Sequence, residues 1–249
     1  MGRAATLATV ALLATTTLAF FLRFMPHNLV LCSQELNVDG TGTPWNRISG
    51  HLTSITANAL VAPDGTPTAE LLTEDNSAND RHHVYQKVSS TTSGRIYTAS
   101  VHATAGTRNF FHIKFGTDDH WISAVFDLSN GTVGQTATGA ISGTITGTSI
   151  SDLGNGWYRC AVSGWVSGDH TFITFGGAGA ATGNTFKTNG DVLYNGESKT
   201  WSLWGAQIER DVQVSAYIPT ATTRKSSIPN IIRATLGITP AWQARCETR

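Results

Sequence analysis

The long interval without proline between Thr68 and Ile218 is the feature that most constrains the fold of this chain. Proline lacks a backbone N–H and is excluded from the interior of a sheet, so this interval suits a long series of paired strands. Within it, apolar and polar side chains alternate repeatedly, which is typical of strands with one buried face. We therefore predict an all-β protein built from antiparallel strands.

Residues 201–209 show the clearest alternation. A strand here would place Trp201, Leu203, Gly205, Gln207 and Glu209 on one face, and Ser202, Trp204, Ala206 and Ile208 on the other. We predict that this segment is the closing strand of one β-domain, well inside a sheet. Gly205 is expected where a neighbouring aromatic ring crosses the backbone. Pro219 then ends the pairing, because it has no N–H to donate.

The same alternation predicts further strands. They are expected at residues 29–31, 51–58, 69–75, 82–89, 95–105, 110–115, 121–128, 149–152, 157–166 and 170–175, and residues 191–198 are expected to lead into the closing strand. The side chains expected in the core include Phe111, Ile113, Phe115, Tyr158, Cys160 and Val162, whereas Arg159 and Ser163 should point away from it. Residues 131–147 are rich in glycine and threonine, and we predict a long, weakly packed hairpin or loop there.

Charge and cysteine content narrow the range of functions. Basic and acidic residues are equal in number, 17 each, and only 14% of residues are charged. A broad basic surface for nucleic acid is therefore not expected. The three cysteines, Cys32, Cys160 and Cys246, form no Cys-x-x-Cys pair, so a zinc or redox motif is not expected. Cys160 is interpreted as a buried core thiol, with a Cys32–Cys160 disulfide as the alternative.

The N-terminal segment from Ala4 to Leu22 contains no charged residue. As a helix it would be about long enough to cross the hydrocarbon core of a bilayer. Three interpretations stay open: a helix buried in a protein assembly, a membrane anchor, and a secretory signal. We expect the segment to be retained as a helix shielded from water. The predicted organisation is a hydrophobic helix in residues 1–27, a β-sandwich in 28–222 and an irregular tail in 223–249.

Four motifs give the sequence a family resemblance. They are NLVLCSQ at residues 28–34, ITANALVAPDGTPTAELLTED at 55–75, LGNGWYRC at 153–160, and WGAQIE with the following SAYIPT at 204–220. Together they resemble a β-sandwich module that recurs in bacteriophage tail and virion proteins. That module is similar in architecture to jelly-roll carbohydrate-binding modules and legume-lectin-like sandwiches. The resemblance implies an antiparallel, jelly-roll-like β-sandwich across residues 28–222.

The resemblance also implies a function. It suggests a non-enzymatic structural protein of the virion, which would be tail-fibre-like, spike-like or capsid-decorating. Its partners would be further copies of the chain, other virion proteins and glycans of the host surface, with membrane contact through Ala4–Leu22 as an alternative. Two other functions stay open: a secreted or membrane-anchored bacterial carbohydrate-binding protein, and a glycoside hydrolase.

The candidate ligand site combines aromatic rings with carboxylates, because sugar rings stack on aromatic side chains while their hydroxyls need polar partners. Trp121 directly follows Asp118, Asp119 and His120, and Trp45 lies in a loop rich in turn-forming residues. These five residues form the predicted ligand-binding set, with a core or rim position as the alternative for Trp121. The loop before Trp121 could also ligate Ca²⁺, although adjacent carboxylates more often form a solvated turn. No other cofactor is expected.

Motifs for catalysis are absent from the sequence. It contains no Gly-x-Ser-x-Gly and no phosphate-binding loop. A glycosidase needs two carboxylates facing each other across a cleft. Glu35, Glu74, Glu197 and Glu209 are available, but they form no local acid-pair motif. We therefore expect no enzymatic activity.

Overall fold

The computed structural model of the chain describes residues 27–37, 44–47, 52–89, 91–139, 141–167, 171–221 and 225–226. The predictions for the N-terminal apolar segment, and for the C-terminal tail apart from Lys225 and Ser226, fall outside these ranges. Every regular element within the ranges is a β-strand. No helix in this part of the chain is long and apolar enough to span a membrane.

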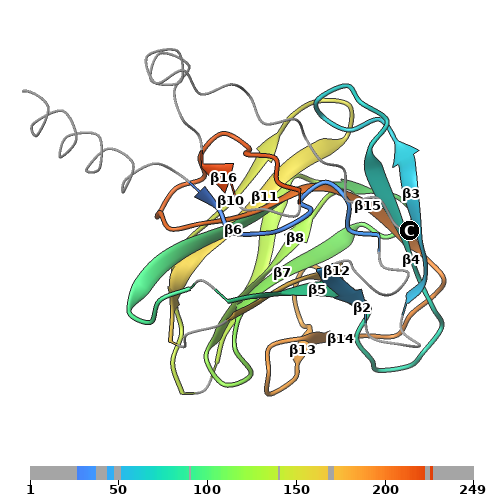
Figure 1. Ribbon diagram of the computed structural model, residues 1–249. Helices are drawn as coiled ribbons and strands as arrows, with labels where there is room; N and C mark the ends of the chain where they lie inside the picture. Colours follow the sequence, from blue (N-terminus) through green and yellow to red (C-terminus); the bar gives the residue numbers. More distant parts are fainter. Residues whose placement is uncertain are drawn as a thin grey trace, which may run out of the picture.

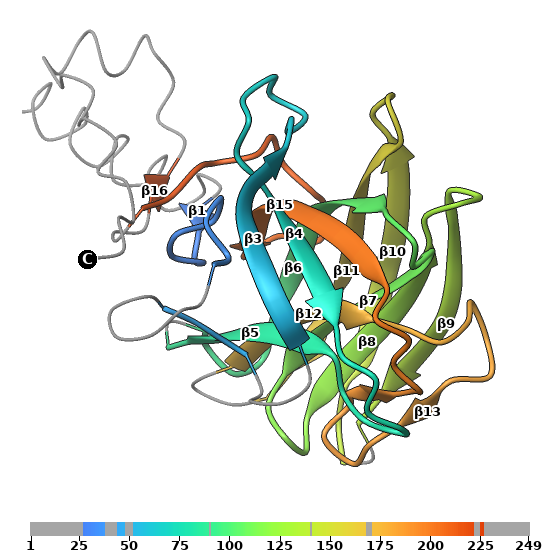
Figure 2. The same ribbon diagram turned by 90° about the vertical axis from the view of Figure 1, so that its right-hand side faces the viewer.

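Two six-stranded antiparallel sheets pack face to face (Figures 1 and 2). The β6 sheet has the strand order β10 (Thr144–Asp152), β11 (Trp157–Val166), β6 (Arg95–Ala105), β15 (Thr200–Glu209), β4 (Ala69–Glu74) and β3 (Leu52–Leu60). The β7 sheet has the order β2 (Trp45–Arg47), β5 (His83–Val88), β12 (Thr171–Gly177), β7 (Phe110–Gly116), β8 (Trp121–Asp127) and β9 (Thr132–Thr138). Two short ribbons pair β1 (His27–Asn28) with β16 (Lys225–Ser226), and β13 (Thr185–Phe186) with β14 (Val192–Leu193). The predicted all-β antiparallel sandwich is confirmed.

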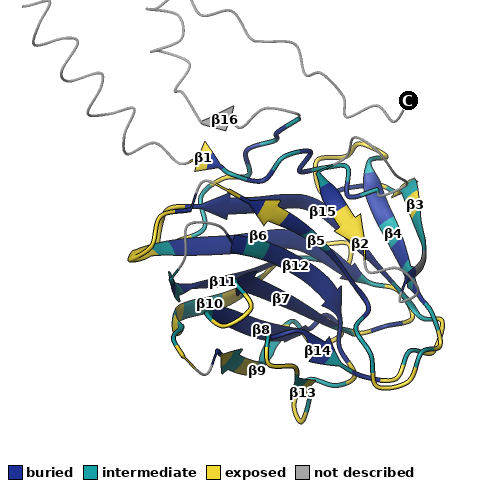
Figure 3. Ribbon diagram, turned by 60° about the horizontal axis from the view of Figure 1, so that its bottom comes forward, coloured by how far each residue is buried: buried dark blue, intermediate teal, exposed yellow. Residues whose placement is uncertain are grey.

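The core lies between the sheets, and the central strands of both are almost entirely buried (Figure 3). Phe111, Ile113 and Phe115 point inward from β7 with no exposed surface, as the alternation predicted. From β11, the side chains of Cys160, Val162 and Val166 belong to the core and that of Tyr158 packs against it, whereas those of Arg159 and Ser163 do not. The predicted register of β11 is therefore confirmed.

Cys160 is a free thiol with no exposed surface. Burial raises the pKa of this thiol, so it stays neutral in the core. The interpretation of Cys160 as a core residue is confirmed, and the alternative Cys32–Cys160 disulfide is absent.

The closing strand β15 lies inside a sheet, as predicted; its neighbours are β4 and β6, and it contains a bulge at Gly205. Gly205 has a φ of +65°, a conformation that glycine adopts without steric penalty. Beyond the bulge, Ala206 and Ile208 take the core positions, while Gln207 and Glu209 turn to the opposite face. The strict alternation predicted for this strand is therefore wrong after Gly205.

Residues 131–147 do not form a hairpin. They contain β9 and the start of β10, which are the edge strands of different sheets and do not pair with each other. Their small side chains bury little surface, which suits exposed strands at the rim of a sandwich. Residues 29–31, predicted as a strand, form none; the backbone N–H of Leu29 instead donates to the carbonyl of Ile208.

Candidate functional site

The strands of the β7 sheet have a second face, called here the outer face, which points away from the core. Side chains alternate along a strand, so the positions between the core residues belong to this face. They include His83 and Tyr85 of β5, Phe172 and Thr174 of β12, His112 and Lys114 of β7, and Trp121 and Ser123 of β8. Most of these side chains are buried although many are polar, which indicates that another part of the chain covers them.

The cover is residues 178–194, called here the strap. It contains the ribbon of β13 and β14, which lies below the β7 sheet in Figure 1. Val125 of β8 is buried in one cluster with Tyr194 of the strap. The Phe186 ring stacks on Trp121 with ring centroids 6.0 Å apart and an interplanar angle of 18°. The strap therefore shields the β8 side of the outer face from solvent.

Besides Phe110, which packs against the cluster of Val125 and Tyr194, two aromatic rings on the outer face remain half-exposed. Tyr85 and Phe172 meet edge to face, with ring centroids 6.0 Å apart and an interplanar angle of 69°. Lys87, two residues after Tyr85 on the same face, is exposed. We call Tyr85 and Phe172 the aromatic platform. Half-exposed rings fixed on a sheet present apolar surface to a ligand at little cost in conformational entropy.

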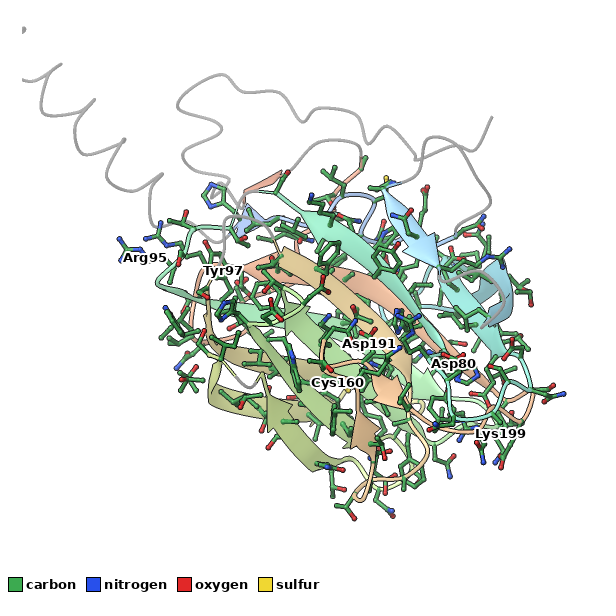
Figure 4. All side chains as sticks on the ribbon, turned by 90° about the horizontal axis from the view of Figure 1, so that it is seen from below. Asp80, Arg95, Tyr97, Cys160, Asp191 and Lys199 are labelled. Carbon is green, nitrogen blue, oxygen red and sulfur yellow. The ribbon has the colours of Figure 1, made fainter. Side chains whose placement is uncertain are left out.

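Asp191 organises the polar groups beside the platform. Its carboxylate lies 3.6 Å from Lys114 Nζ and 3.5 Å from an Arg81 guanidinium nitrogen, and it accepts a hydrogen bond of 2.9 Å from Asn189 Nδ2. The Asp191 side chain is only 4% exposed, whereas 25% of the Arg81 side chain is exposed. Burial by itself would raise the pKa of Asp191, but neighbouring His83 and Lys114 hold it below its ordinary value. Figure 4 labels Asp191 among the side chains on this underside of the molecule.

Two buried histidines complete the outer face. His83 and His112 lie 6.4 Å apart between ring centroids, and burial lowers the pKa of His83 to about 3 and that of His112 to about 4. Both rings are therefore neutral near pH 7. His112 Nδ1 donates to the Gly177 carbonyl at 2.8 Å, which leaves its Nε2 as an acceptor. Gly176 lies between the two rings, where a Cβ would come within 2.6 Å of each residue.

The predicted site around Trp121 is only partly assembled. Trp121 lies on the outer face but is 4% exposed, because the strap covers it and Thr188 accepts a hydrogen bond from its indole at 2.8 Å. Asp118 and Asp119 are exposed in the turn between β7 and β8. His120 is half-buried and its Nδ1 contacts the Ser142 hydroxyl rather than the carboxylates. In this arrangement Trp121 supports the strap and offers no open surface to a ligand.

Trp45 is a core residue. Its side chain is 1% exposed, its ring packs 5.8 Å from that of Phe175, and its indole N–H donates to the Cys32 carbonyl at 3.0 Å. The prediction that Trp45 contacts a ligand does not fit this position. The sequence placed it in a loop, but Trp45 begins β2 at the edge of the β7 sheet, and this strand turns the ring inward.

Glu74 and Glu209, two of the four acidic residues considered for hydrolysis, have structural partners. Glu74 forms a buried ion pair with Arg108 and accepts a hydrogen bond of 2.6 Å from Tyr194 Oη. Glu209 accepts the backbone N–H of Ser215 at 2.9 Å. In the described part of the chain, no group of three or more His, Cys, Asp or Glu side chains is arranged to hold a metal ion. The Ca²⁺ alternative for the β7–β8 turn therefore gains no support from this geometry.

Glu70 is an acidic residue that the sequence analysis did not single out. It is 1% exposed, and burial, with a smaller contribution from Glu35, raises its pKa to about 8. In β4 it alternates with Leu71 and shares a side with core residue Leu72, so it points between the sheets. Glu70 is therefore a neutral core carboxyl group and is separate from the outer face.

Comparisons with known proteins give only distant similarities. No family model matches the sequence, and no curated protein matches it. Among solved structures, a proposed sugar-binding protein from Bacteroides thetaiotaomicron is 9% identical with a TM-score of 0.42, over 74% of this chain and 100% of that one. The xylan-binding domain CBM22-1 of Paenibacillus barcinonensis Xyn10C is 12% identical with a TM-score of 0.40, over 77% and 98%. The enzymatically active domain of bacteriophage CBA120 tailspike protein 4 is 12% identical with a TM-score of 0.36, over 71% and 22%.

These TM-scores are too low to assign a family.

Proposed function

We propose that this protein binds glycans through the aromatic platform on the outer face of the β7 sheet. The observation that carries the proposal is the half-exposed pair of Tyr85 and Phe172 beside polar side chains that Asp191 holds in place. A sugar has an apolar ring face and a rim of hydroxyl groups, so it needs both kinds of partner. Ligand sites of this kind combine an aromatic surface with a few fixed polar groups.

The polar partners next to the platform are already oriented. The partly exposed Arg81 guanidinium lies against Asp191, and the half-buried Asn189 donates to the same carboxylate. Side chains that are fixed before binding lose little conformational entropy when the ligand arrives. Asp191 is almost fully buried, so its expected role is to position Arg81 and Asn189 rather than to contact the sugar.

Substitution of Tyr85 tests the proposal. Tyr85→Ala removes one ring of the platform but no core side chain, because Tyr85 is outside the core cluster. Trp165→Ala is the matched control, since Trp165 is also half-buried but belongs to the opposite sheet, where it points away from the core. The wild type should bind members of an array of immobilised bacterial and plant oligosaccharides. For the best binder, calorimetry should show at least about a tenfold loss of affinity in Tyr85→Ala, equivalent to about 1.4 kcal/mol.

The control decides how that loss is interpreted. Trp165→Ala should keep the wild-type affinity. Unchanged binding by Tyr85→Ala, equal losses in both variants, or no binding of any arrayed glycan by the wild type would each contradict the proposal.

We further propose that the domain is a non-enzymatic recognition module of a bacteriophage particle, with other virion proteins and copies of the chain as neighbours. The four motifs that resemble virion β-sandwich modules support this setting. A secreted or membrane-anchored bacterial carbohydrate-binding protein is the alternative, and it differs in the fate of the N-terminal segment. Mass spectrometry of the native protein distinguishes them, because a mature N-terminus near Met25 would indicate a cleaved signal and favour secretion.

The expected lack of enzymatic activity has its own test. The bound oligosaccharide should be recovered intact after long incubation with the protein. Release of new reducing ends would replace the binding proposal with the glycoside hydrolase alternative.

A further inference from the structure

We infer that the aromatic platform receives the end of a glycan chain rather than the middle of a chain that crosses the sheet. The inference rests on the proposed function and specifies its ligand. It follows from the way the strap closes one side of the outer face.

Exposure falls steeply along the two rows of outer-face side chains that contain Phe172 and Tyr85. In one row, Lys87 is exposed, Phe172 is half-buried and Trp121 is 4% exposed. In the neighbouring row, exposure likewise falls from Asn46 through Tyr85 to Thr174 and Lys114, the last two being 2% exposed. Strands in a sheet are about 4.8 Å apart, so the open part, from β2 to β12, is only about 10 Å wide.

The strap closes one side of the outer face and is fixed in place. The strap is attached at its outer turn, where the backbone N–H of Gln135 in β9 donates to the Ala181 carbonyl at 2.7 Å. It is attached again at its far end, where Asp80 and Tyr194 exchange backbone hydrogen bonds of 3.0 and 3.1 Å. Between these points Phe186 stacks on Trp121.

Buried contacts also hold the strap against the sheet. The Lys114–Asp191 ion pair connects it to β7, and an added Cβ at Gly190 would lie 2.3 Å from the Trp121 ring. A strap packed this closely leaves no room for a saccharide between itself and β8. A long chain laid across the strands would therefore meet the strap immediately after the platform.

The geometry thus defines the ligand. A terminal sugar residue would lie with its ring against Tyr85 and Phe172, and its free hydroxyls would face Arg81 and Asn189 at the foot of the strap. The rest of the chain would leave over β5 and β2, where Lys87 and Asn46 are exposed.

Dependence of affinity on chain length tests the inference with the full-length protein. The probe is the oligosaccharide series, from disaccharide to hexasaccharide, of whichever arrayed glycan the wild type binds. A site for chain ends should give an association constant per chain that stays within about twofold across the series, because added residues make no further contacts. The parent polysaccharide should bind in proportion to the number of its ends.

A second measurement uses the same polysaccharide with its chains cut by limited acid hydrolysis. At constant mass of sugar, cutting creates new ends and should increase the number of bound protein molecules in proportion. An association constant per chain that rises with each added residue, or binding that does not change with the number of ends, would overturn the inference while leaving glycan binding intact. Failure to bind any glycan would instead overturn the proposed function, and the inference with it.

Discussion

Lys114 and Asp191 form an ion pair on the outer face of the β7 sheet, with Nζ 3.6 Å from Oδ1 and with 3% and 4% of their side chains exposed. Removing two charges from water is costly, so such a pair is weak evidence of net stabilisation. Burial lowers the pKa of Lys114 although Asp191 acts in the opposite direction, which agrees with this cost. The pair attaches the strap to β7, so its expected role is to fix the position of the strap on the outer face.

Loss of Asp191 should destabilise the protein more than loss of Lys114. Asp191→Leu leaves the Lys114 ammonium buried without its carboxylate, and we expect a loss of about 3–5 kcal/mol. Lys114→Met should cost less, because Asp191 keeps its contacts with Arg81 and Asn189. Urea unfolding of both single variants and of the double variant measures the coupling. A smaller loss for Asp191→Leu than for Lys114→Met would contradict this assignment of partners.

Mild acid should destabilise the folded state through three buried histidines. Burial lowers the pKa of His83 to about 3, and that of His102 and of His112 to about 4, from 6.5. Between these values the unfolded chain binds more protons than the folded one, so stability falls as the pH drops below about 6.5. The expected slope is about 1.4 kcal/mol per pH unit for each histidine. Glu70 offsets one such contribution, because its pKa is raised to about 8 and the folded state therefore keeps a proton that the unfolded chain loses above about pH 4.5.

Urea unfolding at several pH values between 7 and 4.5 checks this. His112→Gln should reduce the slope of the unfolding free energy against pH by about 1.4 kcal/mol per pH unit, the contribution of one histidine. Carboxylates with lowered pKa, such as Asp191, would act only at lower pH, below the ordinary value of 3.8. A free energy of unfolding that stays constant from pH 7 to pH 5 would show that these histidines are not buried as neutral rings.

Gly205→Ala should be strongly destabilising because two effects act together. The residue has a φ of +65°, and an added Cβ would lie 2.8 Å from His102 Nδ1 and 3.2 Å from the Tyr217 ring. The prediction that an aromatic ring crosses the backbone here is therefore confirmed. Gly183→Ala is the control, with a φ of +79° and no atom within 4 Å of its Cβ. Thermal unfolding should show a loss of about 1 kcal/mol for Gly183→Ala and about 2–4 kcal/mol for Gly205→Ala.

The sequence predicted strands better than it predicted which side chains form the site. Alternation identified β6 and β11 with their observed bounds, because both are long strands whose core face is apolar. It could not show the bulge in β15, which depends on the backbone conformation of Gly205 and not on hydrophobicity. The predicted core positions of Phe111, Ile113 and Phe115 imply by alternation that His112 and Lys114 lie on the opposite side, where the structure has them. Their burial depends on the strap, which has strands of only two residues and follows a glycine-rich stretch.

The aromatic platform had no local signature. Tyr85 and Phe172 come from strands far apart in sequence and are brought together by the pairing of β5 with β12. Trp121 attracted attention because carboxylates precede it, yet those carboxylates point to solvent and the ring packs under the strap. A site formed by strand pairing is determined by register, and register cannot be read from neighbouring residues alone.

Asn28 connects the first of the four motifs to the last, and its loss should be among the most costly substitutions in the chain. The side chain has no exposed surface. Its Nδ2 donates to the carbonyls of Ala206 and Ile218 at 2.9 and 2.8 Å, and its Oδ1 accepts the backbone N–H groups of Val30 and Ile208 at 3.0 and 3.2 Å. All four hydrogen-bonding positions of the amide are therefore used.

Asn28→Ala would leave these four backbone groups without their partner at a site closed to solvent. Each unsatisfied buried group costs about 1–3 kcal/mol, and the costs are not additive, so we expect a loss of at least about 3 kcal/mol. Asn28→Asp should be worse, because it keeps the acceptor but directs a carboxylate oxygen at two carbonyls. Asn46→Ala is the control, since Asn46 is exposed on β2 and should change stability by less than about 0.5 kcal/mol. Urea unfolding should give Asn28→Ala a lower midpoint than the wild type, with an unchanged m-value. Equal midpoints for Asn28→Ala and Asn46→Ala would show that this amide does not hold residues 28–34 against β15.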